Sequence, residues 1–151
     1  MTLTSGVVNC NGSLFLNSGV SLSNSFLPTT GQLGSQFAVT SNTGVGLSST
    51  VVNKFTITNL SIGVWIITGA ISCFPNVACV MAVSLSPTSV TVNSANIINA
   101  IGTGGTTSGI HFTWTLTNAT TASYYITATL SGSATANTSG MTQWATCTRI
   151  G

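Results

Sequence analysis

Few side chains in this sequence could perform acid–base, nucleophilic or metal chemistry. The candidates are one histidine, His111, four cysteines and two basic residues, while Asp and Glu are absent altogether. Without a side-chain carboxylate, the chain cannot supply the paired acids of glycoside hydrolysis or a carboxylate site for Ca²⁺ or Mg²⁺. It also lacks the third member of a Ser-His-acid triad. The composition therefore excludes these classes of site.

A cysteine nucleophile activated by His111 is the one catalytic arrangement left. Cys10, Cys73, Cys79 and Cys147 are the candidates, but no nucleophile motif surrounds any of them. Four cysteines and one histidine would suffice in number for zinc, yet no C-x₂-C pair supplies the usual pair of ligands. We therefore expect no catalytic residue, no cofactor and no metal site, and we expect that the chain is not an enzyme.

Cys73 and Cys79 are a candidate disulfide. They flank five residues, and a hairpin centred on Asn76 would place them directly opposite each other. The alternative is that both thiols stay reduced and buried, because cysteine is among the most buried residue types even when it is free. The sequence leaves the redox state of these two residues open, as it does for Cys10 and Cys147.

The low charge of the chain limits its partners. Its net charge is +2, from Lys54 and Arg149, and 43% of its residues are hydrophobic. Without a basic stripe, the chain cannot gain affinity for nucleic acid by counterion release, and anionic membrane surfaces do not attract it. Its apolar runs fall far short of the ~20 residues that a spanning helix needs. We expect neither nucleic-acid binding nor membrane insertion.

The elements that must position these residues are predicted to be β-strands. Apolar and polar residues alternate most cleanly from Ile110 to Thr117, again from Tyr124 to Leu130, and more briefly around Phe55, with Lys54 on the polar side. Segments 63–74 and 78–85 are apolar on both faces, which predicts central strands covered on both sides. No dozen residues show a 3.6-residue period, so we expect no helices.

Seven or eight short strands in ~100 residues predict an all-β domain, a jelly roll or β-sandwich of about eight antiparallel strands. We assign residues 31–151 to this domain. Residues 1–30 have weaker patterning and are expected to form an extended N-terminal arm or stem. A first strand or two of the same sandwich would explain them equally well.

Three aromatic residues are candidates for a subunit interface: Trp114, Tyr125 and Trp144. Core packing explains Trp114 and Trp144 as well as an interface does. Tyr124 and Tyr125 are neighbours in sequence and must point to opposite faces of a strand. A chain with almost no like charges meets little electrostatic resistance to self-association, and we expect a homotrimer.

Several segments resemble, in their order and spacing, a family of phage tail-fibre and virion structural domains. They are Gly31-Gln32-Leu33-Gly34, the G-x-W strand at 63–69, the Ser/Thr segment at 84–91, the strand at 121–128 and the closing aromatic strand at 144–150. The sequence departs from the family at two places. Val64 stands where an Asp is usual, and the single Arg149 stands where paired arginines are usual.

The resemblance implies a jelly roll similar to the tumour-necrosis-factor and complement C1q heads, associated as a homotrimer on the surface of a virus particle. We expect a fibre or spike domain that contacts other virion proteins and attaches the particle to a host receptor or glycan. The alternative is a capsid decoration, or cement, protein that stabilises the shell. Residues Leu14, Phe15, Leu16 and Phe26 are candidates for docking onto a capsid or stem. Because the N-terminus lacks the features of a signal peptide, we expect synthesis in the host cytoplasm.

The missing carboxylates predict that stability hardly depends on pH in acid. Stability changes with pH only where the folded and unfolded chains bind different numbers of protons, and only the chain termini and His111 titrate between about pH 2 and 8. If His111 is buried and neutral, it alone costs stability as the pH falls. We expect a melting temperature constant within a few degrees from about pH 3 to 5, and a His111→Gln variant that is flat from about pH 3 to 8. Steep acid unfolding in calorimetry would instead indicate a bound ion or partner.

Overall fold

The computed structural model describes residues 34–42 and 44–151 of the protein. The N-terminal arm or stem expected for residues 1–30 lies outside the described residues. So do Cys10 and the candidate docking residues Leu14, Phe15, Leu16 and Phe26.

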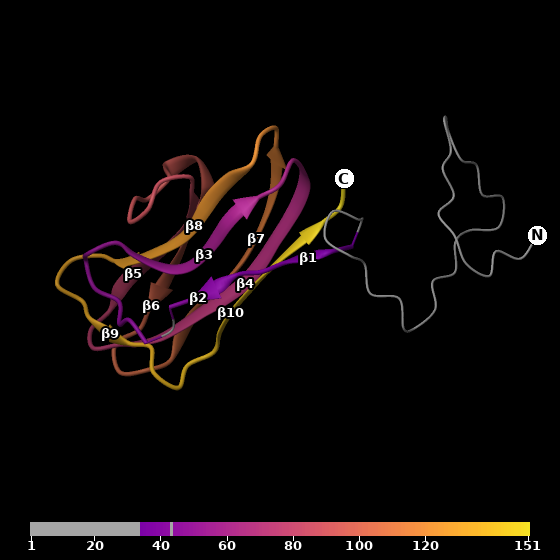
Figure 1. Ribbon diagram of the computed structural model, residues 1–151. Helices are drawn as coiled ribbons and strands as arrows, with labels where there is room; N and C mark the ends of the chain where they lie inside the picture. The colour runs from indigo at the N-terminus through magenta and orange to yellow at the C-terminus, as the bar shows by residue number, and fades with distance from the viewer. Residues whose placement is uncertain (1–33, 43) are drawn as a thin grey trace, which may run out of the picture.

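The described chain consists of β-strands joined by turns, with one short 3-10 helix (Figure 1). In chain order the elements are β1 (Gln36–Phe37), β2 (Thr40–Ser41), β3 (Val52–Leu60), β4 (Gly63–Pro75), β5 (Cys79–Ser86), η1 (Ser94–Asn96), β6 (Ile97–Gly102), β7 (Ser108–Asn118), β8 (Ala122–Leu130), β9 (Ala136–Asn137) and β10 (Gln143–Arg149). The predicted all-β class is confirmed. Over the described ranges, no helix has the length and apolarity to cross a membrane.

The strands form two antiparallel sheets with nested pairing. The sheet β1-β10-β4-β7, with β9 beside one end of β4, is called the β4 sheet here, and β2-β3-β8-β5-β6 is called the β5 sheet. Thus β1 pairs with β10, β3 with β8, β4 with β7 and β5 with β6. One long hairpin has in effect been rolled up so that successive pairs fall in opposite sheets. This arrangement is a jelly-roll β-sandwich, as predicted.

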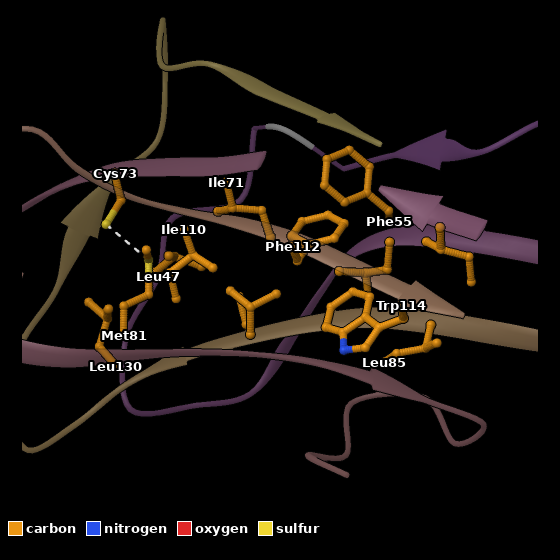
Figure 2. Packing of buried hydrophobic residues seen from close by; sticks show 14 of the residues in the cluster. Leu47, Phe55, Ile71, Cys73, Met81, Leu85, Ile110, Phe112, Trp114 and Leu130 are labelled. Carbon is orange, nitrogen blue, oxygen red and sulfur yellow. Dashed lines mark hydrogen bonds between the residues drawn. The ribbon is translucent and has the colours of Figure 1, made fainter. Parts of the chain in front are cut away.

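Apolar side chains from the inner faces of both sheets fill the space between them. Figure 2 shows Ile110 and Phe112 of β7 in the same cluster as Met81 and Leu85 of β5. Trp114 belongs to this cluster, and its ring stacks on that of Phe112 with centroids 4.7 Å apart. The prediction that one face of β7 is buried is therefore confirmed, since the apolar positions of this strand lie in the core.

The two strands predicted to be covered on both faces differ in this respect. The segment 87–96 folds over the outer face of β5. There the side-chain amide of Asn93 donates to the carbonyl of Leu85 at 3.1 Å, and the Ser84 and Thr127 hydroxyls lie 2.7 Å apart. β4 also lies inside its sheet, but among the described residues no second layer covers its outer face. Phe74 is exposed there. The prediction holds for the end of β5, where Ser84 and Ser86 are buried, but not for its start, where Val80 is 42% exposed, and it is wrong for β4.

Gly69 of β4 is closely packed against both neighbouring strands, β7 and β10. A Cβ atom at this position would overlap both the Phe112 ring and the carbonyl oxygen of Trp144. We expect Gly69→Ala to lower the free energy of unfolding by about 2 kcal/mol, as overpacking does, measured by urea denaturation. Gly44→Ala is the matched control, because no atom of residues 34–42 or 44–151 lies within 4 Å of the added Cβ. Equal stabilities for the two variants would contradict the close approach.

Candidate functional site

The two candidate disulfide cysteines lie in different sheets. Cys73 of β4 is paired with Ser108 of β7, whereas Cys79 of β5 is paired with Gly102 of β6. The expected hairpin is wrong because the chain crosses from one sheet to the other between β4 and β5. Both cysteines are free thiols, and Cys73 Sγ lies 3.5 Å from Met81 Sδ in the core. The alternative of reduced, buried thiols is the one that the structure has.

Burial makes the core cysteines poor nucleophiles. Loss of solvation raises the pKa of Cys73 to about 11 and that of Cys147 to about 12, so that neither forms the reactive thiolate near neutral pH. His111 is exposed on the outer face of β7, away from these core thiols. Over residues 34–42 and 44–151, no group of three metal-ligating side chains comes together.

Lys54 is buried, although the sequence pattern placed it on the polar side of its strand. The register between β3 and β8 shifts between Asn53 and Phe55. Such a bulge inserts one extra residue, so that Lys54 and Phe55 can both be buried. The Lys54 side chain is 0% exposed.

Neutral oxygen atoms surround the Lys54 amine. Its Nζ donates to the carbonyl of Val45 at 2.6 Å and to Thr138 Oγ1 at 3.4 Å, and the Thr138 hydroxyl donates to the same carbonyl at 2.9 Å. Burial lowers the pKa of Lys54 to about 8, and the nearby Cys73 only partly offsets this effect. Lys54 therefore links β3 to two loops. Because its side chain is sealed from solvent, we assign it a structural role.

The outer face of the β4 sheet orders its side chains in rows across β10, β4 and β7, which lie side by side (Figure 1). We call this surface the threonine face. Its three rows contain Trp144, Ala70 and His111, then Thr146, Thr68 and Thr113, then Thr148, Ile66 and Thr115. Thr68 Oγ1 and Thr146 Oγ1 are 2.9 Å apart and share a hydrogen bond.

Trp144 is the large exposed group of the threonine face. Its side chain is 43% exposed, and His111 at the other end of the row is also exposed. Ala70 lies between them and is only 2% exposed, although it points outward. Side chains of the neighbouring strands must therefore cover Ala70, and the two residues directly opposite it are Trp144 and His111.

The threonine face carries no charged side chain. Lys54 lies in the core. Arg149 is opposite Trp65, whose ring is buried, so it lies on the other side of β10 from Trp144, Thr146 and Thr148. The Arg149 side chain donates from Nε to the Gly151 carbonyl at 3.0 Å. The face therefore exposes ring surface and neutral hydrogen-bonding groups, without a Lys or Arg side chain.

The three candidate interface aromatics do not lie on one surface. Trp114 is in the core, as the core-packing alternative held. Tyr125 is half-buried in the β5 sheet, opposite Ser86 and Thr56. Only Trp144 is on the threonine face. One contiguous contact cannot include all three residues, because the two sheets face away from each other on their outer sides.

No protein-family model, no curated protein and no solved structure matches this chain. The threonine face is an exposed surface on which side chains of three neighbouring strands line up, and we take it as the candidate site. Part of this face is visible in the sequence, since Thr alternates with apolar residues at 113–117 and again at 146–148. That these two segments flank β4 follows only from the strand order.

Lys54 predicts a change of stability in alkali. Its pKa is about 8 in the folded chain and 10.5 when unperturbed, so between these values the unfolded chain binds more protons. Lys54 therefore adds stability as the pH rises through this window, since below it the amine is charged in both states and above it neutral in both. We expect the wild type to gain about 3 kcal/mol relative to Lys54→Met across the window, measured by urea unfolding.

Comparing the wild type with Lys54→Met removes most of the effect that cysteine titration has on stability in alkali. The pKa values of Cys73 and Cys147 are raised, so both cysteines cost stability as the pH rises above the value for an unfolded thiol. This loss occurs in both chains and largely cancels in the difference. A difference that stays constant with pH would show that the Lys54 amine is not desolvated.

Proposed function

We propose that this chain is a non-catalytic structural domain of a virus particle, which assembles as a homotrimer and attaches the particle to its host through an uncharged surface. The threonine face is the observation that carries this proposal. It presents an exposed tryptophan and ordered hydroxyls on a rigid sheet, as a binding module requires, whereas the described cysteines and His111 are not placed for catalysis.

The virion location is supported by the resemblance. Four of the segments that carry it fall on strands of the jelly roll: 63–69 lies in β4, 84–91 spans the end of β5 and the following loop, 121–128 overlaps β8, and 144–150 covers most of β10. Shared segments at framework positions are what members of one fold family would have in common. Attachment and capsid decoration are the two roles that the resemblance implies, and the exposed face favours attachment.

The free edge of the β5 sheet supports self-association. β6 is the last strand of that sheet, so one row of its backbone N–H and C=O groups has no partner strand within the sheet. Ile101 of β6 is 83% exposed beside Val80 of β5, its exposed neighbour in register. Protein edges are commonly protected by lysine or proline, and β6 contains neither. A second copy of the chain is the partner that such an edge fits.

The assembly is tested by measuring the mass in solution. Light scattering at micromolar concentration should give about three times the 15.3 kDa of one chain. Ile101→Lys places a charge on the β6 edge and should reduce the mass to that of a monomer. Ile62→Lys is the matched control, because Ile62 is also exposed but lies in the turn between β3 and β4, and it should leave the mass unchanged. A wild-type mass near 15.3 kDa would contradict the trimer.

Antibody labelling of intact particles tests the location. A label at one vertex or on a tail supports attachment, and a label over the whole shell supports decoration instead. Particles that carry no label after purification would contradict both roles.

A further inference from the structure

We propose that the threonine face binds a neutral saccharide, with the Trp144 indole as the platform for a sugar ring and the threonine hydroxyls as its hydrogen-bonding partners. The inference rests on the attachment function proposed above and names the class of ligand that the surface takes. It follows from three properties of the face: one exposed ring, regularly spaced hydroxyls and the absence of charge.

Trp144 has the exposure and the unused hydrogen-bonding capacity of a contact residue. The other two tryptophans, Trp65 and Trp114, are buried in the core, whereas Trp144 is 43% exposed. The indole of Trp65 donates to the carbonyl of Ser61 at 3.1 Å, but within the described residues the Trp144 indole N–H has no acceptor. An indole offers a broad apolar ring together with one N–H donor, which suits a ligand that is apolar on its face and polar at its rim.

The hydroxyls extend this platform along and across the strands. Neighbouring strands are about 4.8 Å apart and residues two apart on one strand are about 6.7 Å apart, so the rows form a grid of neutral donors and acceptors. Thr113 and Thr115 of β7 are exposed within this grid. A face extended in this way suits a chain of sugar rings, because a small ligand needs a concave pocket to bury most of its surface.

The missing charge decides between classes of ligand. Phosphorylated, sulfated or carboxylated ligands need cations, and neither Lys54 nor Arg149 reaches this face. An apolar peptide would leave the exposed hydroxyls of Thr113 and Thr115 without partners, which costs free energy for each buried group. A neutral sugar matches both the aromatic ring and the hydroxyls of this face, since its C–H groups can cover the Trp144 ring while its own hydroxyls bond to those of the threonines.

The backbone that carries the Trp144 ring is fixed by regular strand pairing. Seven consecutive residues of β10 are in register with β4, and the carbonyl of Trp144 packs against Gly69. Ala70 lies between Trp144 and His111 on β4 but is only 2% exposed, so the surface that a ligand meets in this row is that of Trp144 and His111. Sites on such regular elements are more precise than sites on loops, and little conformational freedom is lost on binding.

The test uses the full chain and an array of neutral oligosaccharides containing glucose, galactose, mannose and N-acetylhexosamine, with heparin as an anionic probe. We expect at least one neutral oligosaccharide to bind and to change the tryptophan fluorescence, with an affinity that hardly changes between about 0.05 and 0.5 M NaCl. Trp144→Ala should weaken binding by about tenfold or more, as truncation of a central aromatic anchor does. Trp144→Phe should retain part of the affinity, because it keeps a ring.

Three controls make the outcome specific. Ile62→Ala changes an exposed residue away from the face and should bind as the wild type does. Thr113→Val removes one hydroxyl at nearly constant volume and should weaken binding less than Trp144→Ala. Thermal melts must show that each variant is folded, and light scattering must show that Trp144→Ala keeps the wild-type mass.

The site is overturned if no neutral oligosaccharide on the array binds, if only heparin binds, or if Trp144→Ala binds as tightly as the wild type. It is also overturned if Trp144→Ala dissociates the oligomer, because the face would then be a contact between copies. These failures differ from failure of the proposed function. A trimer on the particle that binds no neutral sugar overturns the site alone, whereas a monomer that binds sugar through Trp144 overturns the assembly alone.

Discussion

The absence of side-chain carboxylates constrains every polar contact in this protein. The one buried amine, that of Lys54, is held by a carbonyl and a threonine hydroxyl, where other proteins often place an acid. Loops are fixed in the same way: Asn53 accepts from the Val90 amide at 2.8 Å, and Asn118 donates to the Leu60 carbonyl at 2.8 Å. Amide and hydroxyl groups thus make the polar contacts that ion pairs often make in other proteins. Each such bond contributes about 1 kcal/mol, so the apolar core must supply most of the stability.

The same constraint connects the core to the surface. Because the two sheets pack through apolar side chains, the threonines of β4, β7 and β10 are directed outward and form the threonine face. Gly69 couples the two sides, since its missing side chain makes room for the Phe112 ring within the core and for the Trp144 backbone beside it. Strand β4 is therefore in close contact both with a core ring and with the backbone that carries the exposed indole.

Local patterns predicted the strands well and their partners poorly. Alternation from Ile110 to Thr117 is enough to place His111 outside and Trp114 in a position to reach the core. Alternation cannot show that β4 pairs with the distant β7 rather than with β5, the next strand along the chain, and this is why the predicted Cys73–Cys79 hairpin was wrong. The bulge that buries Lys54 could not be predicted from the alternation of polar and apolar residues, because an inserted lysine looks like one more polar position on the outer face. The threonine face needed the strand order as well, since its rows join segments far apart in the sequence.

We infer that neither the fold nor the exposed surface of this protein depends on charged side chains. For the fold, the most direct test is to measure how the free energy of unfolding depends on salt. Urea, being uncharged, allows the free energy of unfolding to be measured at both low and high ionic strength. Between about 20 mM and 1 M NaCl, screening removes most interactions between exposed charges, and we expect the free energy of unfolding to change by no more than about 0.5 kcal/mol. A loss of about 2 kcal/mol or more at high salt would show that electrostatic attraction holds the fold together, and would contradict this claim.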